Sequence, residues 1–167
     1  MNVDELRALQ APLKAKYQQE PAAAVVTLRA KGELGGEGVA CKVETGRALV
    51  EAGLHPATGG SGLQACSGDM LLEALVACAG VTLRAVATAL GIEIERGTVM
   101  AEGELDFRGT LGVSKDADIG FKEIRLVIDL DTDAPAEQID TLIKLTKRYC
   151  VVYQTLAKSP AMTTTVT

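Results

Sequence analysis

The sequence lacks tryptophan, is poor in other aromatic residues and has no excess of basic charge. Aromatic residues make up 3% of the 167 residues, and the formal net charge is -5. Proteins that bind nucleic acids need a basic face for the phosphates, and many stack bases on aromatic side chains. The composition therefore argues against a nucleic-acid partner.

Common metal and phosphate motifs are also missing. The four cysteines form no CxxC pair, and the single histidine, His55, stands at no metal-ligand spacing from any of them. The glycine-rich stretch 57–62 is not followed by Lys-Ser or Lys-Thr. We therefore expect no metal site and no phosphate loop. His55 is predicted to be a solvated loop residue or a local proton carrier.

The first ten residues, MNVDELRALQ, carry acids where a signal peptide would have a basic start and an apolar run. We therefore expect a cytoplasmic protein whose cysteines are held as thiols. With 47% hydrophobic and 23% charged residues, the chain has the composition of a folded protein. Its length fits one domain, spanning 1–167, with an N-terminal helical extension (1–22), N-terminal strands (23–52) and a C-terminal part with the central helix (53–167).

The rest of the chain is organised around residues 69–90, DMLLEALVACAGVTLRAVATAL. This stretch is apolar on nearly every face and contains no proline, which predicts a buried helix. Ser67 is the expected N-cap, and Gly91 the expected end. The helix is long enough to cross a membrane, but it holds Glu73 and Arg84 and has no basic flanks. We interpret it as the core helix of a soluble protein, whose second face is covered by dimerisation.

Periodicity and turn residues predict the remaining elements. Two longer helices are expected, one at 3–19 and one from Thr132 or Asp133 to about Arg148. A short helix is expected at 149–156. Strands are expected at 24–31, 39–44, 47–52, 92–107, 121–130 and 162–166, with an irregular, mobile loop at 53–66 and a polar connection at 108–120. Together they indicate an α+β domain with a sheet around the central helix.

Taken alone, each cysteine is more typical of a small buried residue than of a nucleophile. Cys41 lies inside a predicted strand, and Cys66 at the junction of loop and helix. Cys78 lies too far into its helix for the dipole to lower its pKa strongly, so a reactive thiolate there requires a cation. The candidates are Arg47, Arg84, Lys144, Lys147 and Arg148.

Arg84 is six residues from Cys78, on the opposite face of the helix. Arg47 is free to approach, although an ordinary solvated charge at a strand edge explains it equally. Asp69 and Glu73 stand one helical turn apart and suit acid–base work. A favourable charge at the helix N-terminus also explains Asp69.

Two motifs make the sequence more specific. The stretch 70–84, MLLEALVACAGVTLR, resembles the central-helix motif of the OsmC/Ohr family of organic hydroperoxide reductases. The later stretch 149–156, YCVVYQTL, is similar to the second motif of that family, which holds the partner cysteine. Gly46-Arg47 before a glycine-rich loop is similar to its catalytic arginine segment.

The resemblance implies an OsmC-like fold in an intertwined homodimer and a thiol-dependent peroxidase acting on organic hydroperoxides in the stress response. It implies that Cys78 is the peroxidatic and Cys150 the resolving cysteine, with a disulfide between them. Arg47 would hold the Cys78 thiolate, and Asp69 would replace the family glutamate, whose position is Gly68 here. No bound cofactor is implied; an external dithiol such as a lipoyl group would restore the thiols.

The apolar residues Leu71, Leu75 and Val81 would line the substrate site and favour organic peroxides over hydrogen peroxide. Two alternatives remain open. The first is a binding or structural protein of the same fold without peroxidase activity, which Gly68 favours. The second is a redox sensor or sulfur-transfer protein that uses Cys78 without Cys150.

Overall fold

The computed structural model describes residues 3–34, 41–43, 52–63 and 65–166. In these ranges the chain forms helices and one antiparallel sheet with the strand order β2-β1-β3-β4, an α+β fold as predicted. The elements are α1 (Val3–Gln19), η1 (Pro21–Ala24), β1 (Val25–Leu34), β2 (Cys41–Val43), η2 (Pro56–Thr58), α2 (Ser67–Leu90), β3 (Arg96–Asp106), α3 (Phe107–Thr110), β4 (Phe121–Asp131), α4 (Ala136–Tyr149) and α5 (Val151–Ala157).

The sheet is built from three long strands and the short β2. β1 pairs with β3 from Val25↔Asp106 to Leu34↔Gly97, and β3 pairs with β4 along nearly its whole length. Side chains alternate between faces: Val99 and Ala101 are fully buried, while Met100 between them is exposed. The predicted apolar face of β4 is confirmed, because Ile124, Leu126, Ile128 and Leu130 pack against the buried core.

The central helix α2 begins at Ser67, one residue after its N-cap Cys66, so the prediction that Ser67 is the cap was wrong by one position. It ends at Gly91, whose φ of 68° is the left-handed conformation that glycine adopts at low cost. By length and composition α2 could cross a membrane. In this fold it is a core helix, because one side contacts β1 and β3 and another contacts α4 and α5.

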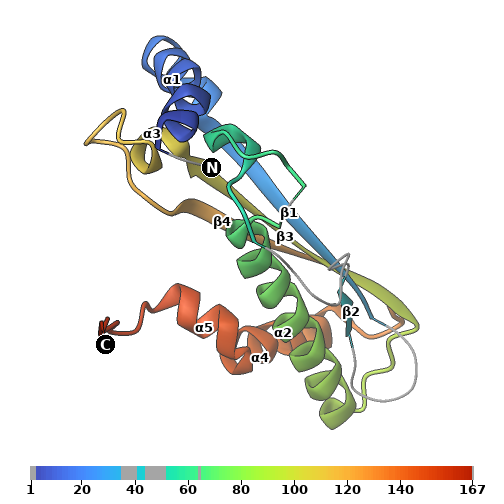
Figure 1. Ribbon diagram of the computed structural model, residues 1–167. Helices are drawn as coiled ribbons and strands as arrows, with labels where there is room; N and C mark the ends of the chain where they lie inside the picture. The colour runs from blue at the N-terminus through green and yellow to red at the C-terminus, as the bar shows by residue number, and fades with distance from the viewer. Residues whose placement is uncertain (1–2, 35–40, 44–51, 64, 167) are drawn as a thin grey trace.

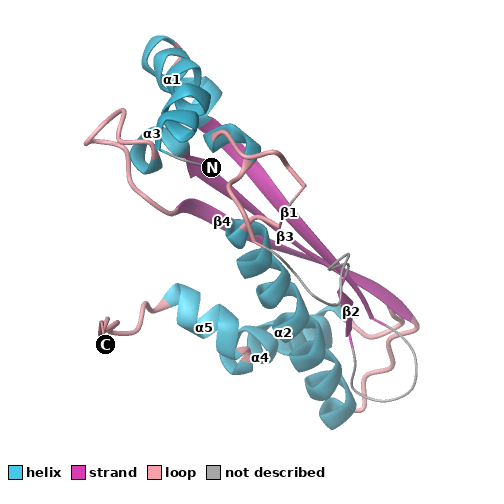
Figure 2. Ribbon diagram, in the orientation of Figure 1, coloured by secondary structure: helices cyan, strands magenta, loops and turns pink. Residues whose placement is uncertain are grey.

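Figures 1 and 2 show this arrangement. The long sheet runs along one side of the molecule, α2 crosses beside it, and α4 and α5 lie against α2. The far end of the sheet carries α1 and α3, away from α4 and α5. The segments that carry Cys78 and Cys150, α2 and the α4–α5 junction, therefore meet on the helical side of the fold.

The loop before α2 is attached to the N-terminal part of the chain. The buried Tyr17 donates its hydroxyl to the Ala57 carbonyl at 2.7 Å. His55 stacks on Phe107 with the ring centroids 5.0 Å apart, and its Nδ1 accepts a hydrogen bond from the Ala57 N–H. His55 is half-buried in this cluster, which corrects the interpretation of it as a solvated residue.

Several predicted boundaries were wrong. The strand predicted from Ile92 begins at Arg96, and Ile92 and Ile94 instead join the buried core. The connection after it begins with the short helix α3, capped by the Asp106 side chain. The last long helix, α4, begins at Ala136 with Pro135 at its N-cap rather than at Thr132 or Asp133.

The tail 162–166 is exposed and forms no strand, contrary to the prediction. Its β-branched residues favour extended backbone, but a strand also needs a partner edge for its hydrogen bonds. The strand predicted at 47–52 lies outside the described residues except for Ala52, which makes a parallel bridge with Ala65.

Candidate functional site

Two cysteines that are far apart in the sequence meet between α2 and α5. Cys78 lies in the middle of α2 and is half-buried. Cys150 is fully buried and forms the junction at which α4 ends and α5 begins. Its φ of -71° and ψ of 109° take the backbone out of the helical region, so the chain turns and α5 starts in a new direction.

The Cys150 sulfur is the N-cap of α5. Its Sγ accepts a hydrogen bond from the Tyr153 N–H at 3.4 Å, a role usually filled by a Ser, Thr or Asp oxygen. Burial raises the pKa of Cys150 to about 11, and the hydrogen bond and negative charge of Cys78 act in the same direction. Cys150 is therefore a protonated thiol at neutral pH.

The pKa of Cys78 is shifted in the opposite direction. Burial alone would raise it, but hydrogen bonds outweigh burial and lower the pKa below its ordinary value. The donors are the Val152 N–H, the Cys150 thiol, the Val151 N–H and the Thr82 side chain. The two sulfurs are thus unequal, and Cys78 is the one that ionises first.

Sequence reasoning missed these donors because it looked for a cation. The amides of Val151 and Val152 are free to bond a sulfur because the first N–H groups of a helix have no partner inside it. Their proximity to Cys78 depends on the packing of α5 on α2 and has no local signal. Thr82, by contrast, did have a local signal in the sequence, because it follows Cys78 by four residues and so lies on the same face of α2.

The cationic candidates have different positions. Arg84 donates to the Ile94 carbonyl at 3.3 Å, so its guanidinium is engaged near the end of α2, in agreement with the prediction that it faces away from Cys78. Arg148 lies over the Tyr149 ring, and Lys147 lines a pocket beside β4. Arg47 lies outside the described residues.

Asp69 lies in the first turn of α2. Nine residues of helix separate it from Cys78, about 13 Å along the axis and on the opposite side. Burial raises the pKa of Asp69, and the nearby His55 opposes that shift. Burial and the Asp69 charge also raise the pKa of Glu73. Asp69 thus faces the His55 cluster rather than Cys78.

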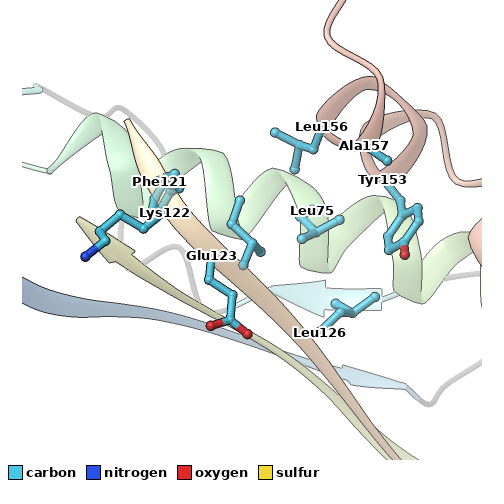
Figure 3. A pocket seen from close by; sticks show the side chains of 9 residues that line it. Leu75, Phe121, Lys122, Glu123, Leu126, Tyr153, Leu156 and Ala157 are labelled. Atoms are coloured by element: carbon cyan, nitrogen blue, oxygen red, sulfur yellow. The ribbon is translucent and has the colours of Figure 1, made fainter. Parts of the chain in front are cut away.

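Two neighbouring pockets lie between β4 and the last two helices and share lining residues; together they are here called the β4 groove. One, of about 280 Å³, includes Leu75, Phe121, Tyr153 and Leu156; the other, of about 370 Å³, shares Tyr153, Ile124 and Leu126 with it. In Figure 3, Leu75 of α2 lies between Leu156 of α5 and Leu126 of β4, while the charged ends of Lys122 and Glu123 extend away.

Of the three predicted substrate-site residues, Leu75 lines this groove and is otherwise buried. Leu71 and Val81 lie elsewhere on α2, and both are exposed. They belong to an uncovered apolar strip at helical spacing on the same face as Cys78, here called the α2 strip. Its exposed members are Met70, Leu71, Ala74, Val81 and Ala85.

The other cysteines stand apart from this pair. Cys66 is half-buried at the N-cap of α2, a full three turns before Cys78. Cys41 lies in β2, where its backbone pairs with Leu34. Within the described part of the chain, no three His, Cys, Asp or Glu side chains are grouped so that they could hold a metal ion.

Comparison with known proteins agrees with this architecture. The chain is similar to the crystal structure of an OsmC-like hydroperoxide resistance protein from Jannaschia sp. CCS1, with a TM-score of 0.60 and 19% identity, covering 83% of this chain and 91% of that one. It is also similar to an OsmC-like protein from Mycoplasma pneumoniae, with a TM-score of 0.56, 18% identity and coverage of 77% and 86%. These likenesses show the fold.

Among curated proteins, no relative matches the chain. The model of the family described as OsmC-like protein matches residues 60–165, which include α2, both redox-cysteine candidates and β4. That match covers well over half of the sequence and contains the two motifs on which the resemblance rested. The chain therefore belongs to the OsmC-like protein family.

Proposed function

We propose that this protein is a thiol-dependent peroxidase that reduces organic hydroperoxides to alcohols, with Cys78 as the peroxidatic and Cys150 as the resolving cysteine. The observation that carries the proposal is the contact between these two thiols, whose pKa values are shifted in opposite directions. Membership of the OsmC-like family and the name of the Jannaschia protein, a hydroperoxide resistance protein, support a peroxidase-type role.

The chemistry follows from the ionisation of the pair. The Cys78 thiolate attacks the distal oxygen of the hydroperoxide, the O–O bond breaks, and the alkoxide takes a proton and leaves as an alcohol. Cys78 is then a sulfenic acid. The Cys150 thiol loses its proton as its sulfur attacks the Cys78 sulfur, the S–O bond breaks, and the leaving hydroxide takes up a proton and departs as water, which leaves the disulfide. An external dithiol, such as a lipoyl group, reduces this disulfide by exchange.

Arg47 keeps the role of the cation in this proposal. The described donors to Cys78 are neutral groups, and a guanidinium would stabilise the thiolate further and polarise the peroxide. Asp69 would act through Arg47, as the residue that orients it. Its position on the far side of α2 from Cys78 fits such an indirect role better than direct contact with the peroxide.

The substrate is an organic rather than an inorganic peroxide in this proposal. Leu71 and Val81 lie on the same face of α2 as Cys78, and Leu75 connects that helix to the β4 groove. An alkyl chain that covers these side chains gains roughly 25 cal/mol for each Å² of apolar surface removed from water, whereas hydrogen peroxide gains nothing.

The protein is proposed to act as a cytoplasmic antioxidant homodimer, without a nucleic-acid or membrane partner. The α2 strip supports the dimer, because a helix that is apolar all round leaves one face uncovered in the single chain. A net charge of -5 is unfavourable for binding to phosphates of nucleic acids or anionic lipids.

Peroxide treatment followed by peptide mass spectrometry tests the proposal. One equivalent of cumene hydroperoxide should produce a Cys78–Cys150 disulfide and one equivalent of alcohol, and hydrogen peroxide should react more slowly. With excess hydroperoxide, Cys150→Ser should accumulate over-oxidised Cys78, while the matched control Cys66→Ser should behave as wild type. Sustained turnover by Cys150→Ser would favour the one-cysteine sensor or sulfur-transfer protein. Unmodified thiols in the wild type would favour a binding protein of this fold.

A further inference from the structure

Thr82 is a polar side chain beside the reactive sulfur for which the family resemblance provides no role. It lies on α2, four residues after Cys78, and is half-buried. Residues four apart in a helix are neighbours on one face, with Cβ atoms about 6 Å apart. This spacing places the Thr82 hydroxyl beside the Cys78 thiol, where it acts as a donor that lowers the pKa of Cys78.

This use of a helical threonine is unusual in the protein. A threonine within a helix commonly donates its hydroxyl to the carbonyl four residues earlier. Thr88 donates in this way to the Arg84 carbonyl at 2.8 Å, and Thr141 donates to the Glu137 carbonyl at 3.0 Å. Thr82 instead interacts with the side chain of the residue four positions earlier.

The donors around the two sulfurs show what Thr82 adds. The Val152 N–H acts on both sulfurs. Cys150 also receives the Tyr153 N–H, whereas Cys78 also receives the Val151 N–H and the Thr82 side chain. The other donors to Cys78 are Cys150 and backbone N–H groups. Thr82 donates from its side chain, so a substitution can remove this donor without changing the backbone.

We propose that Thr82 is a further catalytic residue of this site, whose hydroxyl donates to the Cys78 sulfur and so helps to keep that sulfur ionised. The proposal deepens the proposed peroxidase function and rests on it. Thr82 keeps its proton throughout: its hydrogen bond stabilises the negative charge on sulfur until that charge moves to the leaving oxygen. Cys150 is the titratable side chain that contacts Cys78 in the described part of the chain, and Arg47 is proposed to act on the same sulfur.

The effect of losing the Thr82 hydroxyl on the reaction rate of Cys78 should depend on pH. The effect of losing a purely structural side chain should not. At a pH where Cys78 is only partly ionised, losing the Thr82 donor reduces the thiolate fraction and slows every reaction of that sulfur. At a pH where Cys78 is fully ionised, the fraction no longer changes. A thiolate with fewer hydrogen bonds is then as nucleophilic or more so, because nucleophilicity rises with thiol pKa.

The test measures alkylation of Cys78 by iodoacetamide against pH in the full chain, with peptide mass spectrometry to separate Cys78 from the other cysteines. Hydrogen bonds to charged groups are strong enough that Thr82→Val should react roughly tenfold more slowly at pH 7. The difference should vanish or reverse above the titration midpoint of that variant. Thr82→Ser, which keeps the hydroxyl, should restore the wild-type profile.

The control is Thr88→Val, a change in the same helix that removes an exposed hydroxyl remote from the site. It should leave the profile unchanged. Identical profiles for Thr82→Val and wild type would overturn the proposal, as would Thr82→Ser that behaves like Thr82→Val. If Thr82→Val does not fold, the Thr82→Ala and Thr82→Ser profiles decide in the same way. Alkylation requires no peroxide, so a protein without peroxidase activity would still give a clear result about Thr82.

Discussion

Cys78 and Cys150 lie side by side between α2 and α5, and the two sulfurs are unlike. The buried Cys150 holds its proton, with a pKa of about 11, whereas donors from α5 and from Thr82 lower the pKa of Cys78. The proton that remains on the pair after the first ionisation therefore resides on Cys150. Such a pair has a nucleophile and a nearby thiol that can close a disulfide, which is the arrangement a two-cysteine peroxidase requires.

The first prediction concerns the pH dependence of the two thiols. Since the pKa of Cys78 is lowered and that of Cys150 is raised, iodoacetamide should modify Cys78 first at pH 7 to 8. Its rate should level off below the pH at which an ordinary thiol titrates, while Cys150 should require a pH near 11. Peptide mass spectrometry after timed labelling measures both. In denaturant the two rates should become equal, and equal rates in the native protein would contradict the assignment.

The second prediction concerns Arg47. Arg47→Ala should raise the pKa of Cys78 towards the ordinary thiol value and slow peroxide reduction by roughly tenfold or more, because a charged donor would be lost from the thiolate. Arg47→Lys should retain part of the effect, since it keeps the charge but not the planar fork. The thiolate absorbance near 240 nm against pH measures the shift. A suitable control is Arg96→Ala, which removes an exposed ion pair with Asp131. An unchanged Cys78 titration in Arg47→Ala would eliminate Arg47 as the activating cation.

The third prediction concerns stability. Thr146 is fully buried on α4, and its hydroxyl makes no hydrogen bond within the described part of the chain. Thr146→Val keeps the shape and removes the unsatisfied group, so it should raise the free energy of unfolding by about 1 kcal/mol. Urea denaturation measures the change. Thr141→Val, at an exposed position on the same helix, should shift it by less than about 0.5 kcal/mol. A destabilised Thr146→Val would mean that the hydroxyl has a partner in solution.

The fourth prediction concerns the α2 strip. If a second copy of the chain covers these side chains, the wild type should sediment as a dimer, and Val81→Glu should dissociate it, because a charge would be buried without a partner. Sedimentation velocity over a concentration series measures the mass. Leu63→Glu introduces the same charge at a highly exposed position and should remain dimeric. A wild-type monomer at micromolar concentration would refute the dimer.

Much of the fold could be predicted from short stretches of sequence. The α1 span matches the prediction from Val3 to Gln19, and α2 differs only in its first residues. The alternation in β4 was readable because one face of that strand packs on the core. The strand predicted at 162–166 does not form, because residue propensity alone does not supply the neighbouring strand that its backbone needs.

The candidate site, like the fold, could be predicted from the sequence only in part. The sequence by itself determined which cysteines could carry the chemistry: one inside an apolar helix and a second at the start of another. Those properties depend on residue type and helical spacing, which are local. Only the tertiary structure decided that Cys150 meets Cys78, that the α5 amides turn towards that sulfur, and that burial keeps the second thiol protonated. Hydrogen bonding and desolvation depend on which atoms surround a group, and here those atoms come from helices that are distant in sequence and packed together by the core.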